Sequence, residues 1–318
     1  MPATQTTAST IPWLSPEQVI EKLKIRPCMP GPLFSYSTLL GGWTESTLGC
    51  VVGLDDHGFH RGDGVFEALR VINRRPYLIE PHLQRLRTSA ERIGLRVPWD
   101  LSFLQQVIQT GIARYPEPEA LLRLFVTRGP GGFSTNPLES QAPHLFCVLM
   151  PFRPVPEEKY VKGVRIGKSA VGVKDPWLAI TKSLNYLPNV MMKKESLERG
   201  LDFTVSFDHD GGLGESSTEN IVVLSEQGEL VHPPLSGILK GCTMTRLFDL
   251  VEVKKLLPVK RGQKIRESDL YRARGAFMVG TTLDVISVSE YEGEILPATT
   301  WSKTLRDLLI IDQQSSGS

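Results

Sequence analysis

The hexapeptide TKSLNY at Thr181–Tyr186 and the octapeptide GESSTENI at Gly214–Ile221 are the two stretches around which this chain is organised. Lys182 lies between a strand-like segment, LAI, and an apolar segment, LPNVMM, which is an unusual setting for a solvent-exposed lysine. Glu215 follows a glycine-rich turn, and Asn220 comes five residues after it. A lysine taken alone is most often a surface charge, but a buried amine has the lowered pKa that a Schiff-base lysine requires.

The pairing of these stretches indicates a particular chemistry. An amine and a carboxylate directed at opposite ends of one small aromatic ring are what pyridoxal phosphate chemistry requires, because the amine forms a Schiff base and the carboxylate keeps the pyridine nitrogen protonated. Taken singly, Lys182 and Glu215 are also compatible with surface charges, and Tyr186 with a core aromatic. The combination therefore carries the prediction that the cofactor is pyridoxal 5'-phosphate.

Chain length and amino-acid composition limit which classes of protein and which kinds of partner are possible. A length of 318 residues favours roughly two domains, and 41% hydrophobic with 22% charged residues is ordinary for a globular protein. A formal net charge of +1 predicts neither a nucleic-acid nor a membrane partner. Four cysteines without CxxC spacing predict no metal site and no disulfide framework. The first residues lack a secretory pattern, and no apolar stretch reaches the ~20 residues of a membrane helix, so we expect a cytoplasmic location.

Proline and glycine positions, together with the spacing of apolar residues, predict the domain organisation. We expect an N-terminal extension at 1–47, with a short helix at 15–23 and irregular chain at 26–47, followed by a small α/β domain at 48–150. Three prolines among eight residues make 151–158 the best candidate for a linker, and a large domain fills 159–318.

Secondary structure is predicted from apolar spacing and turn residues. In the small domain this predicts strands at 49–54, 65–72, 120–127 and 144–150, and helices at 81–94 and 101–113. In the large domain it predicts a helix at 188–200, strands at 203–207, 221–224, 276–279 and 285–288, and a helix that begins at Thr243.

A phosphate group needs a helix N-terminus, hydroxyl groups and a cation. The stretch LKGCTMTRLFDL places Gly241 before a helix, with the Cys242 amide and the Thr243 hydroxyl in its first turn. VGTT at 279–282 adds Gly280 and Thr281 at a strand end. Arg85 is an exposed charge on helical spacing alone, and the first stretch alone is equally compatible with an ordinary capped helix.

Six motifs now stand in one order: GDGVFEALRV, HLQRL, TKSLNY, GESSTENI, ILKGCT and GTTLDVISV. Over roughly residues 48–310 the chain resembles the class IV aminotransferases, the fold-type IV pyridoxal phosphate enzymes. The resemblance implies an α/β (α+β) fold with a small N-terminal α/β domain, a larger C-terminal pseudo-barrel domain, the cofactor in the cleft between them, and a homodimer.

The same resemblance implies roles for individual residues. Lys182 would bind the cofactor aldehyde covalently, Glu215 would contact the pyridine nitrogen, and Tyr186 would lie beside the ring hydroxyl. Leu239 would pack on the ring face. The phosphate would be held by Arg85, Cys242, Thr243, Gly280 and Thr281, with Cys242 acting through its backbone amide.

The branch of the family is left open between branched-chain and D-amino acid aminotransferases. Phe66 and Arg123 match the branched-chain pattern, whereas Arg61 stands where a tyrosine is expected. Since a guanidinium can bind a carboxylate through two parallel hydrogen bonds, Arg61, Arg123 and Arg128 are the candidates for the substrate carboxylate. Arg61 is equally compatible with a surface charge or a pair with Asp63.

Two competing functions remain. One is an aminodeoxychorismate lyase that makes p-aminobenzoate, which Ala68 and Gly280 disfavour because lyases carry threonine and asparagine at these positions. The other is a non-catalytic ligand-binding protein, which an intact Lys182–Glu215 pair disfavours. The favoured prediction is a transfer of the amino group between an amino acid and a 2-oxo acid.

Overall fold

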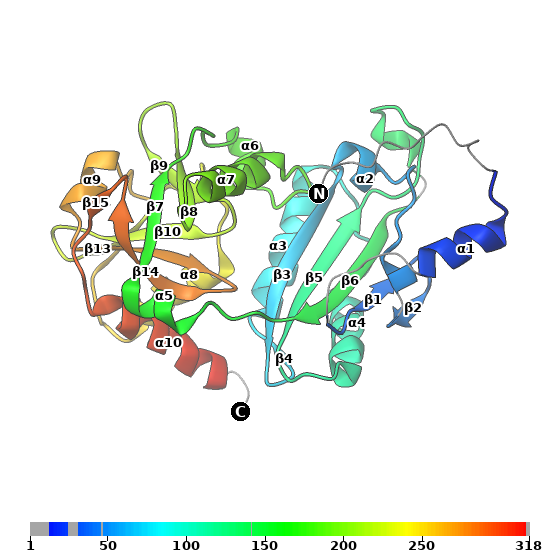
Figure 1. Cartoon of the computed structure of the whole chain (residues 1–318), viewed down its shortest axis with the longest axis horizontal. Helices are drawn as coiled ribbons and strands as arrows, with labels where there is room; N and C mark the ends of the chain where they lie inside the picture. Colours follow the sequence, from blue (N-terminus) through cyan, green and yellow to red (C-terminus); the bar gives the residue numbers. More distant parts are fainter. Residues whose placement is uncertain (1–12, 25–30, 46, 141, 316–318) are drawn as a thin grey trace.

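Two β-sheets organise the chain in the computed structural model, which describes residues 13–24, 31–45, 47–140 and 142–315 (Figure 1). The first sheet has the strand order β2-β1-β6-β5-β3-β4, and all its pairings are antiparallel. Its strands are β1 (Phe34–Ser37), β2 (Gly42–Thr44), β3 (Gly64–Ile72), β4 (Arg75–Pro76), β5 (Ala120–Thr127) and β6 (His144–Pro151).

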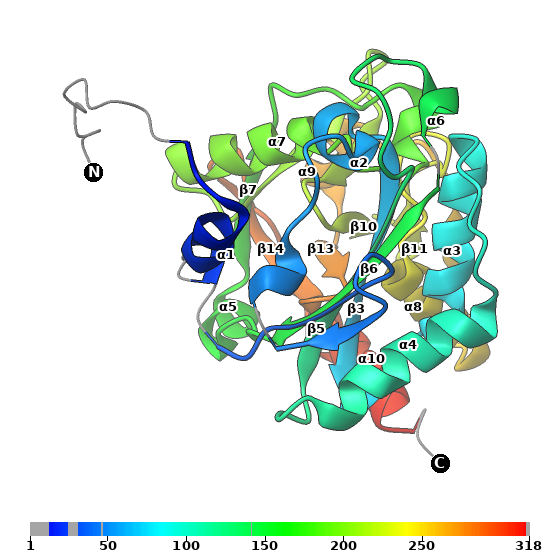
Figure 2. The same ribbon diagram turned by 90° about the vertical axis from the view of Figure 1, so that its right-hand side faces the viewer.

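Helices α3 (Ile79–Arg92) and α4 (Leu101–Arg114) pack on one side of this sheet (Figure 2). In α3 the side chains of Leu83, Leu86 and Ala90 are fully buried, as expected for one apolar face of a helix. Helix α4 begins where the Asp100 carboxylate accepts a hydrogen bond from the Phe103 amide, 2.8 Å away. The first core therefore forms between the sheet and these two helices.

The first sheet begins earlier in the chain than the sequence indicated. Residues 34–37 pair with β6 and residues 42–44 pair with β1, so this part of the expected N-terminal extension belongs to the sheet. The expected strand at 49–54 is wrong, because residues 47–50 form the short helix η1 (Thr47–Cys50). Glycine- and proline-rich sequence around residue 40 conceals both strands, since β1 pairs with β6, more than a hundred residues away, and β2 pairs only with β1. Residues 1–12 and 25–30 of the expected extension lie outside the described residues.

The second sheet has the order β12-β11-β10-β13-β14-β7-β8-β9, with β15 paired to β14. It curls so that β9 lies beside β10. Strand β7 is parallel to both β8 and β14. The strands are β7 (Val164–Lys168), β8 (Phe203–Phe207), β9 (Leu213–Ser216), β10 (Asn220–Leu224), β11 (Leu230–His232), β12 (Val259–Arg261), β13 (Gly275–Gly280), β14 (Asp284–Tyr291) and β15 (Glu294–Ile295).

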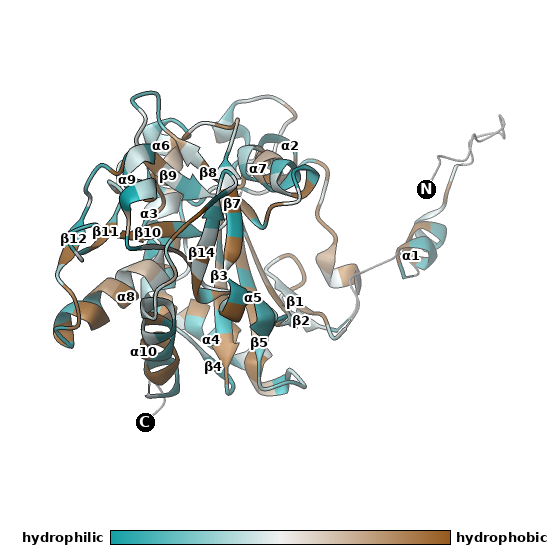
Figure 3. Ribbon diagram, turned by 60° about the vertical axis from the view of Figure 1, so that its left-hand side comes forward, coloured by the Kyte–Doolittle hydropathy of each residue, from teal (hydrophilic) through white to brown (hydrophobic). Residues whose placement is uncertain are grey.

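Two hydrophobic cores lie on either side of this curled sheet. Every residue of β10 is buried, and Figure 3 shows hydrophobic colouring on β10 as well as on stretches of α8 and α10. One core gathers around Ile166, Val205 and Met278, and the other packs α8 and α10 against Val222 and Phe277. The helices here are α5 (Glu157–Lys162), α6 (Pro176–Ala179), α7 (Leu187–Glu198), α8 (Cys242–Val253), α9 (Glu267–Arg272) and α10 (Trp301–Ser315).

Three short elements complete the description: α1 (Pro16–Lys24), α2 (His57–Arg61) and the 3-10 helix η2 (Pro137–Glu139). Helix α1 has no buried residue and lies at the outer edge of the molecule, beyond β1 and β2 in Figure 1. Within the described ranges, no helix is long and apolar enough to cross a membrane. Cys50, Cys147 and Cys242 are free thiols, and Cys28 lies outside the described residues.

Candidate active site

One cavity of about 200 Å³ receives residues from both sheets. The first sheet contributes β3 and β5, and the second contributes the ends of β9, β10 and β13 and the start of α8. The cavity is lined by Phe66, Ala68, Arg85, Leu121, Arg123, Lys182, Tyr186, Glu215, Thr218, Glu219, Asn220, Leu239, Gly241, Cys242, Thr243, Val279, Gly280, Thr281 and Thr282. All the predicted cofactor residues are thus brought together by the fold.

Lys182 is held by its backbone against the first sheet. Its carbonyl accepts a hydrogen bond from the Phe66 amide at 3.0 Å, and its own amide donates to the Ser89 hydroxyl at 3.1 Å. Two residues on, the Leu184 amide donates to the Gly64 carbonyl at 2.9 Å. The stretch TKSLNY therefore bridges the two halves of the molecule, and a lysine at its centre is placed by main-chain bonds on both sides.

The side chain of Lys182 is buried between two aromatic rings. Its Nζ lies 4.5 Å from the centre of the Phe66 ring and 5.9 Å from that of Tyr186. Burial lowers the pKa of this amine most, the nearby Arg85 guanidinium lowers it further, and the pKa is about 8. A substantial fraction of the amine is therefore neutral near physiological pH, as a nucleophile or a proton acceptor requires.

Glu215 lies on β9 and points into the same cavity. One carboxylate oxygen accepts a hydrogen bond from the Leu239 amide at 3.0 Å, and the other lies 3.8 Å from Lys174 Nζ. Burial raises the pKa of this carboxyl above its ordinary value, although Lys174 and the Leu239 amide oppose the shift. The carboxylate is consequently a better proton acceptor than an exposed one.

Asn220 shapes the loop that leads into α8. Its side-chain amide donates to the Leu239 carbonyl at 3.0 Å. A Cβ added to Gly241 would lie 2.0 Å from the Asn220 Oδ1, so only glycine fits at this point of the loop. Glu215 and Asn220, five residues apart, therefore both bind the backbone of Leu239. Glu215 accepts from its amide, and Asn220 donates to its carbonyl.

Arg85 is not the exposed charge that helical spacing alone suggests. Its guanidinium forms two hydrogen bonds of 2.7 Å with the carboxylate of Glu67, whose side chain is fully buried, and donates to the Lys240 carbonyl at 2.8 Å. The second Glu67 oxygen also lies 2.7 Å from His82 Nδ1. Burial raises the pKa of Glu67, but the attraction of Arg85 and His82 is larger and holds it well below its ordinary range.

Sequence reasoning missed the roles of Glu67 and His82. Glu67 is on β3, fifteen residues before His82, and nothing local indicates that the two side chains meet beneath the cavity. One signal was available in the sequence. Side chains alternate between the two faces of a strand, so Glu67 lies on the same face of β3 as Val65 and Leu69, toward α3. A buried carboxylate there requires a cation beside it.

The start of α8 is the anion-binding edge of the cavity. Cys242 and Thr243 are its first two residues, and the first amides of a helix have no intrahelical acceptor and carry the positive end of its dipole. Arg85, Gly280, Thr281 and the Thr243 side chain border the same cavity. Gly280 allows close packing, because an added Cβ would lie 3.2 Å from Glu219 Cγ.

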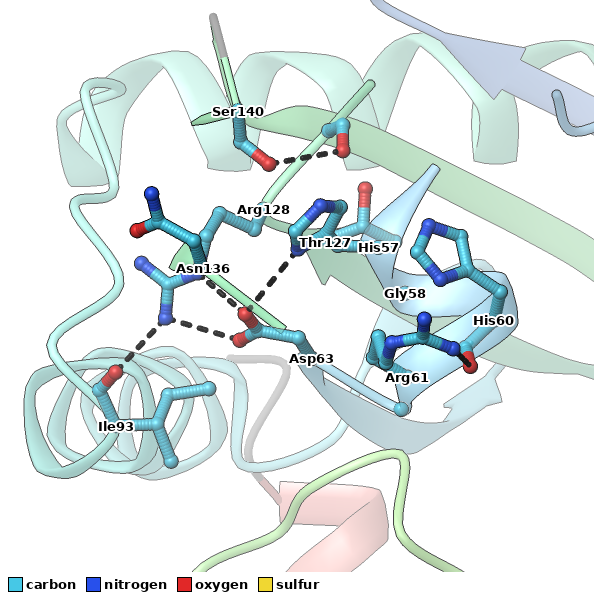
Figure 4. Close-up of polar contacts among 12 residues, drawn as sticks. His57, Gly58, His60, Arg61, Asp63, Ile93, Thr127, Arg128, Asn136 and Ser140 are labelled. Carbon is cyan, nitrogen blue, oxygen red and sulfur yellow. Dashed lines mark hydrogen bonds and ion pairs between the residues drawn. The ribbon is translucent and has the colours of Figure 1, made fainter. Parts of the chain in front are cut away.

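Of the three candidate arginines for the substrate carboxylate, only Arg123 borders the cavity. Arg61 donates to the carbonyls of Phe133 and Ser134, at 3.2 Å for the latter, and Arg128 is paired with Asp63 at 2.5 Å (Figure 4). Of the alternatives left open for Arg61, the pair with Asp63 does not form, because Arg128 pairs with Asp63 and Arg61 is an exposed side chain on the 133–134 backbone.

Arg128 also donates to the carbonyls of Ile93 and Gly94, at 2.8 and 3.0 Å. It therefore joins the C-terminus of α3 to the loop before β3, and Figure 4 shows its guanidinium directed at Asp63 and Ile93. The Arg123 guanidinium, by contrast, forms no hydrogen bond or ion pair with any residue in the described part of the chain. An exposed guanidinium that borders a cavity is available to an incoming carboxylate.

One titratable residue of the cavity, Glu219, was absent from the predicted set. Glu219 is buried, accepts a hydrogen bond from the Thr218 hydroxyl, and has a pKa raised by burial. Across the described residues, no group of three metal-ligating side chains is close enough to hold a metal ion.

Residues 64–291 match the family described as amino-transferase class IV. The chain belongs to the class IV aminotransferase family.

Similar proteins cover most of the chain. It is 28% identical over 316 residues to the chloroplastic D-amino-acid transaminase of Arabidopsis thaliana, covering 96% of this chain and 83% of that protein. It is 29% identical over 248 residues to a putative branched-chain-amino-acid aminotransferase of Methanocaldococcus jannaschii, covering 77% and 84%. A solved hypothetical aminotransferase from Mycobacterium tuberculosis, in its pyridoxal phosphate-bound form, has a TM-score of 0.76 at 26% identity and covers 87% of this chain and 97% of that one.

Class IV aminotransferases depend on pyridoxal phosphate, and this cavity fits that cofactor chemically. It offers one buried amine with a lowered pKa, one buried acid with a raised pKa, and a helix N-terminus beside an arginine. These are the groups that an aldehyde, a basic ring nitrogen and a phosphate need.

Proposed function

We propose that this aminotransferase moves an amino group from an α-amino acid to a 2-oxo acid, with Lys182 as the catalytic residue. The observation that supports this most directly is the buried Lys182 amine, whose pKa is about 8, in the same cavity as the acid Glu215. Pairs of titratable groups whose pKa values are displaced in this way mark sites of proton transfer.

The division of labour follows from the residues themselves. When bound, pyridoxal phosphate supplies an electrophilic aldehyde and a ring that delocalises the electron pair left by a departing α-proton. Lys182 would carry that aldehyde between turnovers and, once released, its neutral amine would take the α-proton and return it on the product side. Positioned proton transfer of this kind is worth roughly 10²–10⁴-fold in rate.

Other residues would position the cofactor. Glu215 would stabilise the protonated ring nitrogen as a carboxylate, a form that Lys174 and the Leu239 amide favour against the effect of burial, and Tyr186 would contact the ring hydroxyl. Leu239 would pack on the ring face. The phosphate would be held by Arg85, the Cys242 amide, Thr243, Gly280 and Thr281, all of which border the cavity.

The substrate carboxylate would bind Arg123. This guanidinium borders the cavity and has no partner among the described residues, whereas Arg61 and Arg128 are occupied by protein carbonyls and Asp63. Phe66 would limit the side-chain pocket, since its ring lies at the cavity wall beside Lys182.

The decisive experiment uses the Lys182→Ala variant. We expect it to lose turnover and the yellow absorbance of the covalently held cofactor, whereas a folded variant that kept full activity would overturn the assignment. Assay of the wild type with D- and L-amino acids, against pyruvate and 2-oxoglutarate, then identifies the donor and its chirality. Formation of p-aminobenzoate and pyruvate from aminodeoxychorismate, without amino transfer from any of the amino acids to a 2-oxo acid, would support the lyase instead.

Arg123 is tested against a matched arginine. Arg123→Leu should raise the KM for the amino donor by about tenfold or more, the usual cost of losing a bidentate carboxylate contact. Arg96 is an exposed arginine outside the cavity, and Arg96→Leu should leave KM unchanged. Equal KM values for the two variants would exclude Arg123 from carboxylate binding.

A homodimer in the cytoplasm remains part of the proposal. An exposed apolar face on α7 supports the dimer. The exposed fractions there are 69% for Leu187, 55% for Val190 and 43% for Met191, and Trp177 on α6 is 59% exposed. Light scattering coupled to gel filtration tests the dimer, and Val190→Lys should weaken it. Imaging of a fluorescent fusion of the full chain tests the location.

A further inference from the structure

A second cavity lies between α3 and α8, next to the candidate active site. Its volume is about 580 Å³, and Arg85, Leu239 and Cys242 line both cavities. Helix α3 packs on the first sheet and α8 on the second, and Figure 2 shows the two helices near each other. A cavity of this size falls within the range of roughly 300–1,000 Å³ that is typical of small-molecule sites.

Both helices turn a row of polar side chains toward this cavity. Gln84, Thr88 and Arg92 come from α3, and Thr245, Arg246 and Asp249 come from α8. Residues three or four positions apart lie on the same face of a helix, so each row is one stripe. Neighbouring helices usually meet through apolar stripes. Here two polar stripes border a cavity instead, which suits a polar ligand.

Four cations line the cavity, and two of them already have acidic partners. The Arg85 guanidinium is paired with Glu67, and Arg246 is paired with Asp312 at 2.9 Å. Each of these pairs is close to neutral overall, so the charge of the cavity depends on the other two cations.

Arg92 and Lys240 supply that charge. The Arg92 guanidinium donates to the neutral carbonyl of Ile180, and the Lys240 ammonium forms no hydrogen bond or ion pair with any residue that the structure describes. The acid on the cavity wall, Asp249, is itself bound to Arg261 at 2.8 Å. The cavity therefore carries an excess of positive charge, which attracts an anion.

Unused hydrogen-bond donors indicate the kind of anion. Within the described chain, the side chains of Gln84, Thr88 and Thr245 form no hydrogen bond with another residue. Together with an ammonium and a guanidinium, they surround the cavity with donors from two helices, which suits the several oxygens of a phosphate group. Leu78 and Ile180 add apolar surface to the wall, so an organic group can be held beside the phosphate.

We propose that the groove between α3 and α8 is a second ligand site, which binds a small phosphorylated organic molecule through Arg92 and Lys240. The ligand contacts one helix from each half of the molecule. The inference goes beyond the proposed function and does not depend on it, because neither Arg92 nor Lys240 borders the candidate active site.

The first test is calorimetric titration of the protein saturated with pyridoxal phosphate, so that the candidate active site is filled. Pyrophosphate and ATP should each bind at one molecule per chain, and ATP should bind more tightly because its organic part adds apolar contacts. Citrate, which carries carboxylates only, should bind at least about tenfold more weakly than pyrophosphate. Absence of binding by both phosphate compounds would overturn the proposal, and citrate bound as tightly as pyrophosphate would overturn the assignment to phosphate.

Charge reversal then locates the site. At physiological salt, where distant charges are screened, Lys240→Glu and Arg92→Glu should each weaken pyrophosphate binding about tenfold or more, because an attraction becomes a repulsion. Lys254→Glu, just beyond the end of α8, and Arg96→Glu, beyond the end of α3, are the matched controls, since both side chains are exposed and outside the cavity. Equal affinities in all four variants would contradict the site.

Circular dichroism shows whether these variants are folded. If a charge reversal impairs folding, the neutral variants Lys240→Gln and Arg92→Gln replace it, and they should weaken binding in the same order with a smaller effect. Pyrophosphate binding that neither neutral variant weakens would also overturn the proposal.

Thr281→Val separates this inference from the proposed function, because Thr281 borders the candidate active site and not the groove. Pyrophosphate binding that falls with Thr281→Val but not with Lys240→Glu would place the anion in the active site, which overturns the inference and leaves the function standing. A protein that never turns yellow with pyridoxal phosphate would overturn the function, and pyrophosphate binding that still depended on Lys240 would support the groove.

Discussion

At the scale of single residues, the cavity depends on charges that are buried in pairs. Glu67 is the clearest case, because its carboxylate has no exposure and contacts both Arg85 and His82 at 2.7 Å. Neither cation could remain buried without it, since an uncompensated charge in the interior is costly. The polar face of α3 is therefore tied to β3 by one acid.

We expect Glu67→Gln to lower the free energy of unfolding by about 3 kcal/mol, because it leaves Arg85 and His82 without their counter-charge. The variant should also bind pyridoxal phosphate more weakly, since Arg85 loses the partner that orients it. Urea denaturation of the cofactor-free protein and a spectrophotometric titration measure the two effects. Glu226→Gln, at an exposed position, is the control, and equal unfolding free energies for the two variants would contradict this account.

A second residue-scale prediction concerns pH. The pKa of Lys182 is about 8 instead of the ordinary 10.5, and its neutral form is the one that reacts with an aldehyde. The rate of cofactor attachment to the cofactor-free protein should therefore rise with pH through about 8 and level off above it. Stopped-flow absorbance across pH 6 to 10 checks this, and a rate that rose without levelling to pH 10 would indicate an unperturbed lysine.

At the scale of elements, the loop from Leu239 to the start of α8 decides the shape of the anion-binding edge. Asn220 on β10 holds the Leu239 carbonyl, Glu215 on β9 holds the Leu239 amide, and Arg85 on α3 holds the Lys240 carbonyl. Three separate elements thus orient one short loop, and the helix that follows it starts at a defined point.

Gly241→Ala should disturb this loop, since the added Cβ would meet Asn220 Oδ1 at 2.0 Å. We expect the affinity for pyridoxal phosphate to fall by roughly tenfold or more, with a smaller effect on stability, because the strain is relieved by shifting the helix start. Gly42→Ala is the matched control, since nothing lies within 4 Å of a Cβ there. Unchanged affinity in Gly241→Ala would show that the loop position is unimportant.

At the scale of the whole molecule, the C-terminal helix α10 joins the two halves. Asp312 on this helix accepts a hydrogen bond of 2.7 Å from the Tyr77 hydroxyl of the first half and one of 2.9 Å from Arg246 on α8. Nearby, Asp284 pairs with Arg70 of β3 at 3.0 Å. The cavity between the sheets therefore keeps its width partly through contacts remote from it.

Asp312→Asn should lower the free energy of unfolding at pH 7 by about 3 kcal/mol, because the carboxylate is mostly buried and paired. Burial raises the pKa of Asp312, but Arg246 and Tyr77 lower it more, so its folded pKa is below the ordinary value. The stability that Asp312 contributes is thus present above about pH 4 and is lost as pH falls below that, where wild type and variant should have the same free energy of unfolding.

The control is Asp307→Asn, in an exposed ion pair on the same helix, which should lower the free energy of unfolding by less than about 1 kcal/mol. Urea denaturation at pH 7 and pH 3 measures all of these.

Much of the site was predictable from short stretches of sequence. Lys182, Glu215 and the start of α8 lie in segments whose local chemistry is unusual, and each motif carries its own glycine, hydroxyl or charge. The helices at 81–94 and 101–113 were recognisable because apolar spacing is a local property. Local patterns are encoded in neighbouring residues, so they can be read without knowing what the chain packs against.

Tertiary structure alone decided what depends on distant partners. Strands β1 and β2 were missed because β1 is a strand through its pairing with β6, and the linkage of Glu67, His82 and Arg85 joins β3 to α3. The tertiary structure also distinguished the three candidate arginines, which the sequence alone could not rank. Arg61 and Arg128 bind backbone carbonyls and Asp63, whereas Arg123 borders the cavity. Charge and residue type are properties of the sequence, but whether a charge is paired, buried or free depends on which residues the fold brings beside it.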